Sequence, residues 1–278
     1  MRDVLFVSHC PAGPLRQFVA TAEGYGVPAN PTGQHRGLPS RHLTLVVELA
    51  APLQVTGLRS SVTAHGVVGG LHLRPALINA AQPQEGIQYS LTALGGWALL
   101  GVPAADLHQQ AIDLTDLWGS AADQLVNELL EATSWPERFR ILDAALLRRH
   151  DADVVPVPDE VAEAWRMIFA SDGRLRMAAV AAHVGWSRRH LSEQFRISTG
   201  LTPKQAARIA RFEAARRLLV SRGRQSLAEI ATLSGFADQP HLAREWQTFA
   251  GCSVGAWLRQ ELPFIQDNDS ARPAELLT

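Results

Sequence analysis

The sequence predicts an α+β protein in which a β-rich N-terminal half with helices precedes an all-α C-terminal part. Short apolar runs separated by glycine, proline and serine fill residues 41–94 and predict strands. Helical periodicity follows after residues 99–104, and a degenerate repeat of two helices occupies residues 177–253. The chain has 278 residues, of which 46% are hydrophobic and 19% charged, so two ordinary domains are expected.

The N-terminal strands are predicted where valine, leucine and isoleucine cluster between turn residues. They cover residues 43–49, 53–56, 66–68 and 87–92. Ser120 and Ser134, each with an acidic residue three positions later, predict two capped helix starts. Residues 148–150 indicate a helix end, and the proline-containing stretch 155–158 indicates a linker. The predicted units are therefore an N-terminal domain at 1–150, a helical domain at 158–260 and an acidic tail at 261–278.

The repeat in the C-terminal part has the same pattern in both copies. Residues 177–186 match residues 227–236 at an offset of 50, and after one inserted residue the offset becomes 51. Each copy predicts a short helix that ends at a glycine, then an aromatic residue, a tight turn and a second helix. That order is typical of a helix-turn-helix, whose second helix fits a major groove.

Capping signals support these boundaries. Ser226 with Glu229 forms a capping box, and Ser187 caps the second helix of the first copy. Arg176 stands where Ser226 stands, so the first copy begins without a side-chain cap. Thr202, followed by a proline, starts a long helix that is predicted to run to about residue 222 and to join the two motifs.

Charge is unevenly distributed along the chain, although the net charge is only −1. Residues 1–171 carry 11 basic and 17 acidic side chains, for a net charge of −6. Residues 172–262 carry 14 basic and 7 acidic side chains, for a net charge of +7. A basic block that coincides with the repeat is the charge pattern expected of a nucleic-acid-binding domain.

The outward faces of the two candidate recognition helices carry side chains suited to DNA. Arginine can donate two hydrogen bonds to guanine, and glutamine can pair with adenine, whereas a lysine is better suited to a phosphate. The predicted DNA-binding residues are Ser187, Arg188, Arg189, Ser192, Arg196, Lys204, Gln239, His241 and Arg244. Arg208 and Arg211 are further predicted phosphate contacts. The alternative is that these side chains only solubilise two helices.

Residues from about 158 to 260 resemble the paired helix-turn-helix domain of AraC/XylS-type bacterial transcription regulators. The resemblance rests on the motifs at 184–191, 200–204 and 234–253. It implies a sequence-specific DNA-binding regulator whose two recognition helices enter successive major grooves. Val254 and Ala206 depart from the family pattern at packing positions. By position in the motif, the family's DNA contacts fall on Arg189, Ser192, Gln239, Pro240, His241 and Arg244.

The N-terminal half is similar to domains that accompany this module in part of the family, through residues 99–104 and 113–119. Such domains have a small barrel-like core and sense ligands or mediate pairing. The resemblance thus implies double-stranded DNA as a partner and leaves RNA polymerase, a small-molecule effector and a homodimer open. Four aromatic residues could line a ligand site, although ordinary core positions are the simpler interpretation: Tyr25, Tyr89, Trp97 and Trp118.

An enzyme in the N-terminal half is the main alternative function, beside a ligand-binding protein with little DNA binding. Six histidines there suggest a metal site, but no His-x-His or His-Glu-x-x-His spacing occurs. They are His9, His35, His42, His65, His72 and His108. Cys10 is the only thiol in this half, which disfavours a cysteine-based methyl acceptor. No catalytic residue, metal or cofactor is predicted.

Localisation is predicted from missing targeting signals. No apolar run approaches the roughly 18 residues of a membrane span, and the first residues lack a secretory signal. We therefore expect a cytoplasmic, nucleoid-associated protein without a membrane partner.

Overall fold

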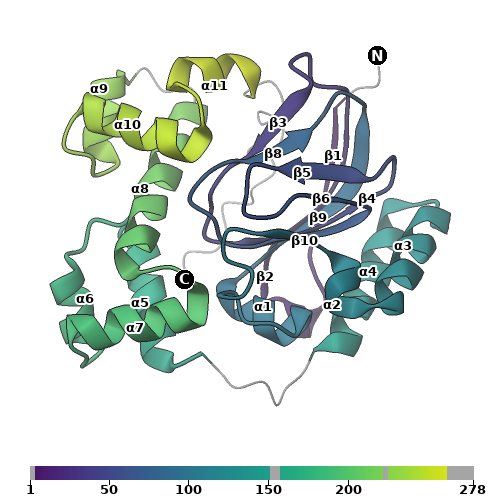
Figure 1. Cartoon of the computed structure of the whole chain (residues 1–278), viewed down its shortest axis with the longest axis horizontal. Helices are drawn as coiled ribbons and strands as arrows, with labels where there is room; N and C mark the ends of the chain where they lie inside the picture. Colours follow the sequence, from purple (N-terminus) through teal and green to yellow (C-terminus); the bar gives the residue numbers. More distant parts are fainter. Residues whose placement is uncertain (1–3, 151–156, 222–224, 262–278) are drawn as a thin grey trace.

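The computed structural model describes residues 4–150, 157–221 and 225–261. Ten strands lie in the first 113 residues, and seven helices follow from residue 159 onward within the described ranges. Figure 1 shows the strands in the middle, helices α3 and α4 on one side of them and helices α5–α11 on the other. This arrangement confirms the predicted α+β class, with a β-rich part followed by a helical part.

The larger sheet has six antiparallel strands in the order β1-β2-β9-β4-β7-β10. Its central strands, β4 and β9, are apolar on the buried side, which is why the apolar runs predicted them correctly. The bounds are β1 Leu5–His9, β2 Val19–Val27, β4 Leu43–Glu48, β7 Gly66–Gly69, β9 Gln84–Leu91 and β10 Ala111–Asp113.

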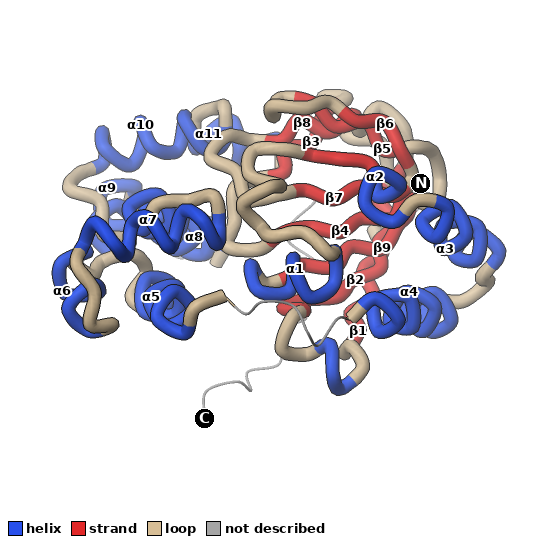
Figure 2. The backbone as a smooth tube through the Cα atoms, turned by 60° about the horizontal axis from the view of Figure 1, so that its bottom comes forward, coloured by secondary structure: helices blue, strands red, loops and turns tan. Residues whose placement is uncertain are grey.

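The smaller sheet has four antiparallel strands in the order β3-β8-β5-β6. Its separate small core includes Leu53, Val55 and Val67, so the two sheets pack face to face. Figure 2 shows the two layers with the helices around them. The bounds are β3 Gln34–Gly37, β5 Leu53–Thr56, β6 Val62–Ala64 and β8 Ala76–Asn79.

Four helices complete the N-terminal part: α1 Ala93–Leu100, α2 Leu114–Trp118, α3 Ser120–Glu131 and α4 Trp135–Arg149. A 3-10 turn at Gly13–Leu15 precedes them in the chain. Helices begin at both predicted places, but neither serine makes a side-chain capping hydrogen bond. Ser120 is the first residue of α3 and Gly119 is the residue before it, whereas Ser134 directly precedes α4.

Within residues 157–221 and 225–261 the C-terminal part forms seven helices, and one hydrophobic core continues from the sheets into them. Their bounds are α5 Asp159–Ala170, α6 Met177–His183, α7 Arg188–Thr199, α8 Pro203–Val220, α9 Leu227–Leu233, α10 Gln239–Ala250 and α11 Val254–Gln260. The predicted linker lies largely outside the described residues, as does the acidic tail beyond Glu261. Glu261 itself belongs to the core and not to a tail, since its side chain is completely buried.

Candidate nucleic-acid interface

The first helix-turn-helix unit consists of α6, a four-residue turn at 184–187 and α7. Gly185 takes a φ of 74°, which favours glycine, and its N–H donates to the carbonyl of Ala182 over 3.2 Å. The N–H of Trp186 donates to the carbonyl of Ala181 over 2.9 Å. These two bonds close the end of α6. The side chain of Ser187 then accepts from the backbone of His190 and caps α7.

The second unit repeats this geometry with α9 and α10. Gly235 has a φ of 78°, and the N–H of Phe236 donates to the carbonyl of Ala231 over 2.9 Å. Asp238 caps α10 by accepting from the backbone of His241. The sequence repeat is therefore a structural repeat, as predicted, down to the hydrogen bonds that close each first helix.

Helix α8 lies between the two units (Figure 1). Thr202 and Gln205 form a reciprocal capping box at its start, so the predicted N-terminus of this helix is confirmed. In its second half the ring of Phe212 is completely buried, with its centroid 4.9 Å from that of Trp246 in α10. In the first unit, the ring of Phe195 stacks on Trp165 of α5 at 5.6 Å. Each unit is thus held by aromatic packing.

The predicted DNA-binding residues all lie at the surface. Seven are exposed, and Ser192 and His241 are partly buried. Among the described residues, six of them form no side-chain hydrogen bond or ion pair: Arg188, Arg189, Arg196, Lys204, Gln239 and Arg244. Nδ1 of His241 accepts from the backbone N–H of Ala237 over 3.3 Å, which leaves its Nε2 on the other edge of the ring.

Arg208 and Arg211 have partners inside the protein, which weakens their prediction as phosphate contacts. The guanidinium of Arg208 donates to both oxygens of Glu245 in α10, over 2.7 and 3.1 Å. Arg211 donates to the carbonyl of Gly173 over 2.9 Å, and burial lowers its pKa. Sequence spacing could not show this, because Glu245 follows Arg208 by 37 residues.

Comparison with known proteins identifies the helical part. Residues 180–260 match the family model described as a helix-turn-helix domain. These residues form an AraC-type helix-turn-helix domain. No curated protein shows significant sequence similarity to the chain.

Most of the chain shares its fold with ToxT from Vibrio cholerae. One ToxT structure, from strain O395, has a TM-score of 0.52 at 11% sequence identity and covers 86% of this chain and 96% of ToxT. A second, from strain SCE256 with an unsaturated fatty acid bound, has a TM-score of 0.51 at 11% identity and covers 94% of this chain and 98% of ToxT. At this identity the likeness shows a common fold.

Two buried carboxylates join the AraC-type domain to the N-terminal part. Glu213 of α8 accepts from the backbone and the guanidinium of Arg41, each over 2.8 Å. Glu261, directly after α11, lies against His35 and Arg36 of β3. Sequence reasoning missed both pairs. The one available signal was Glu213 within the apolar run of α8, where an unpaired charge would be costly.

The first unit of the AraC-type domain also contacts the N-terminal part without charges. Gly200, which ends α7, lies so close to His108 and Ala105 that a side chain there would collide with them. In the second unit, Gly251 at the end of α10 lies beside Pro75. The C-terminal ends of α7 and α10 therefore contact the N-terminal part.

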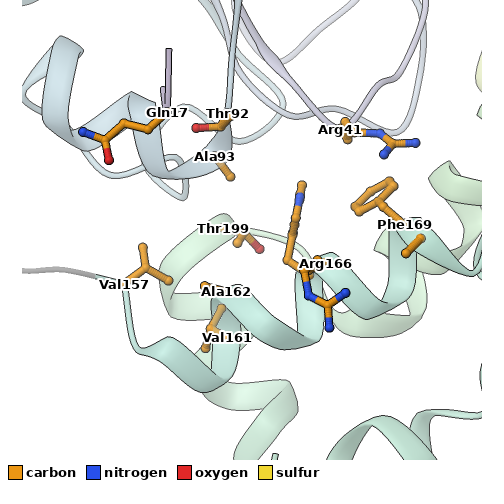
Figure 3. A pocket seen from close by; sticks show the side chains of 12 residues that line it. Gln17, Arg41, Thr92, Ala93, Val157, Val161, Ala162, Arg166, Phe169 and Thr199 are labelled. Carbon is orange, nitrogen blue, oxygen red and sulfur yellow. The ribbon is translucent and has the colours of Figure 1, made fainter. Parts of the chain in front are cut away.

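A cavity of about 390 Å³ lies between the N-terminal part and α5, the first helix of the C-terminal part. Figure 3 shows Thr92 and Ala93 on one side of it and Val161 and Ala162 on the other. The cationic side chain Arg41 is paired with Glu213, as described above. The lining residues are Gln17, Arg41, Thr92, Ala93, Val157, Val161, Ala162, Trp165, Arg166, Phe169, Ala170 and Thr199.

The aromatic residues considered for a ligand site do not line this cavity. Tyr89 and Trp118 are buried in the core, and Tyr25 and Trp97 are partly buried. Two of them donate hydrogen bonds to buried carboxylates. The hydroxyl of Tyr89 donates to Asp143 over 2.7 Å, and that of Tyr25 donates to Glu48 over 2.9 Å. Burial raises the pKa of both tyrosines, and the neighbouring carboxylates raise it further.

The histidines of the N-terminal part are bonded to separate partners. His9 lies 3.0 Å from the carboxylate of Asp143, His65 bonds the carbonyl of Glu48, and His108 bonds that of Leu71. Within the described ranges, no group of three histidine, cysteine or acidic residues could hold a metal ion. Nor is any described helix long and apolar enough to cross a membrane.

Proposed function

We propose that this protein is a transcription regulator that binds double-stranded DNA by placing α7 and α10 in two successive major grooves. The observation that carries the proposal is the pair of equivalent helix-turn-helix units, each with an exposed second helix. Five of their outward side chains have no hydrogen-bond or ion-pair partner among the described residues: Arg188, Arg189, Arg196, Gln239 and Arg244. The surrounding block carries a net charge of +7. Cationic donors without internal partners are available to phosphates and bases.

The proposed contacts divide by chemistry. Arg188, Arg189, Arg196 and Arg244 have paired donors for guanine edges, and Gln239 suits adenine. Ser192 and Nε2 of His241 can each make a single hydrogen bond to a base or a phosphate. Ser187 and Lys204 lie beside helix starts, where contacts position the protein on phosphates without selecting sequence.

A selection from randomised duplex DNA by the full-length chain tests this function. We expect enrichment of two short motifs about 10 base pairs apart and binding that weakens steeply with salt. The variant Arg189→Ala should lose preference in one motif and Arg244→Ala in the other. Arg140→Ala, an exposed arginine of α4, is the matched control and should change neither. A protein that binds no DNA at low salt would contradict the proposal.

We also propose that residues 1–150 sense a small molecule and control the domain at 158–260. The cavity between the two parts supports this, since residues of both parts line it and its apolar wall comes mainly from Val157 and α5. A ToxT structure with the same fold holds an unsaturated fatty acid. Because Arg41 and Arg166 are already paired with Glu213 and Glu163, we expect a largely apolar effector.

Thermal unfolding with two probes tests the effector site. Palmitoleate and its uncharged methyl ester should raise the melting temperature of the wild type, the ester at least as strongly. Ala162→Trp would fill the cavity and should abolish both shifts, whereas Ala121→Trp on exposed α3 should preserve them. Equal shifts in the wild type and Ala162→Trp would rule out the cavity as the site.

The proposed role also includes pairing of two chains and contact with RNA polymerase. Both would take place on chromosomal DNA in the cytoplasm.

A further inference from the structure

The outer face of α7 carries one carboxylate among its cationic side chains. Glu193 is exposed, and it forms no side-chain hydrogen bond or ion pair with any other described residue. It follows Arg189 by four residues and precedes Arg196 by three, so the helix aligns the three side chains in one stripe. Both spacings allow ion pairs along a helix, yet the structure contains neither. The carboxylate is therefore available on the face that we assign to DNA.

The internal repeat pairs this carboxylate with a cation. At the offset of 51, Glu193 of α7 corresponds to Arg244 of α10. Each stands two residues after the buried leucine and two residues before the buried aromatic residue of its helix. The two side chains thus occupy equivalent positions on recognition helices of equivalent geometry. They have opposite charge and opposite hydrogen-bonding capacity.

An acidic side chain on a DNA-binding face gains no binding energy from the DNA backbone, because the phosphates repel it. In the major groove an ionised carboxylate can only accept, and the amino group of cytosine is the donor that matches it. Adenine also has an amino group, but its neighbouring N7 is an acceptor that repels a carboxylate. At the equivalent position, arginine donates to O6 and N7 of guanine.

We infer that Glu193 is a base-specifying residue that selects a cytosine in the half-site of the first unit. Arg244 selects a guanine at the corresponding place in the other half-site. This inference rests on the proposed DNA-binding function and adds to it that the two half-sites differ at equivalent positions. It also implies that Glu193 contributes specificity at the expense of affinity, whereas the arginines contribute both.

The test compares full-length variants in the same selection and in titrations on selected and random duplexes. Glu193→Ala should lose the cytosine preference at one base pair, on the order of tenfold, while the other half-site is unchanged. Its affinity for random DNA should stay equal or rise, because a repelled charge has been removed. Glu193→Arg, which copies the second unit, should change the preference at that pair to guanine. Glu131→Gln, an exposed residue of α3, removes one negative charge elsewhere and should behave as the wild type.

The outcomes separate the inference from the function on which it rests. If the wild type enriches two motifs and Glu193→Ala keeps every preference, the inference is overturned and the DNA-binding function stands. If the wild type enriches no sequence and binds no DNA, both fail. Glu193→Gln keeps the size of the side chain, so its circular dichroism and binding verify that any loss comes from charge and not from an unfolded α7.

Discussion

Glu261, at the end of α11, places its carboxylate Oε2 2.7 Å from Nδ1 of His35 on β3. The other oxygen accepts from the backbone N–H and the guanidinium of Arg36, each over 3.2 Å. The carboxylate is completely buried, so these bonds supply all of its stabilisation in place of water. A residue at the end of the AraC-type domain is thus bound to a strand formed more than 220 residues earlier.

Glu261→Gln should lower the free energy of unfolding by about 3 kcal/mol, because Arg36 loses the charge that compensates it in the interface. Urea denaturation measures the change. The exposed control Glu131→Gln should stay within about 0.5 kcal/mol of the wild type. Equal stability of Glu261→Gln and the wild type would mean that the interface does not depend on this carboxylate.

Cys252 should react slowly with iodoacetamide and report on the same interface. Burial and the nearby charge of Glu261 raise the pKa of its thiol, with Arg36 acting in the opposite direction, whereas Cys10 is exposed. At pH 8 we expect Cys10 to be alkylated first, as followed by peptide mass mapping. Glu261→Gln should accelerate alkylation of Cys252, and equal rates at both thiols in the wild type would contradict the structure.

Arg244→Ala and Gln239→Ala should each weaken binding to the selected site by about 1 to 3 kcal/mol and relax preference at one base pair. Both side chains are exposed and have no partner among the described residues, so the fold should not change. Fluorescence anisotropy on the selected and random duplexes gives the two affinities. Equal losses on both duplexes would exclude base contacts by these side chains.

Lys204→Ala should weaken binding to selected and random DNA alike and reduce the salt slope by about 1, because a phosphate contact releases a counterion. Arg208→Ala provides the contrast, since Arg208 pairs with Glu245 and should affect stability more than the salt slope. Titrations at several salt concentrations distinguish the two variants. A sequence-dependent loss for Lys204→Ala would be inconsistent with a phosphate contact.

Glu48 should make the N-terminal part less stable as pH rises. Burial raises its pKa, and hydrogen bonds from Glu85, Tyr25 and Ala50 only partly offset this. The carboxyl group therefore binds its proton more tightly in the folded protein than in the unfolded chain. This stabilisation is complete below the unfolded pKa of roughly 4.3, and it is lost as the pH rises through the raised pKa of the folded state. Urea denaturation between pH 4 and 7 should show the wild type losing stability relative to Glu48→Gln, and a pH-independent difference would refute this.

Much of the candidate interface could be predicted because its signals are local. Glycines 185 and 235 end their helices in a conformation that other residues rarely adopt, and Ser187, Thr202 and Ser226 cap helices within three residues. The surface position of the predicted DNA-binding residues also follows from helical periodicity. Which of them contact DNA stays a prediction.

The N-terminal sheets were predicted only in part. Central strands such as β4 have continuous apolar runs, whereas β2 contains two glycines and a glutamate and was missed. It is a strand because β1 and β9 pair with it on both sides. Its backbone hydrogen bonds, and not its side chains, decide its conformation.

The sequence alone therefore determined the helix-turn-helix repeat, whose turns and caps depend on neighbours a few residues apart. Only the tertiary structure decided that Arg208 pairs with Glu245 and that Glu213 and Glu261 join the two parts. It also decided where the cavity lies. The physical reason is the sequence distance between the groups that interact. A helix cap is satisfied within one turn, but a buried charge needs a partner that only the folded chain brings within hydrogen-bonding distance.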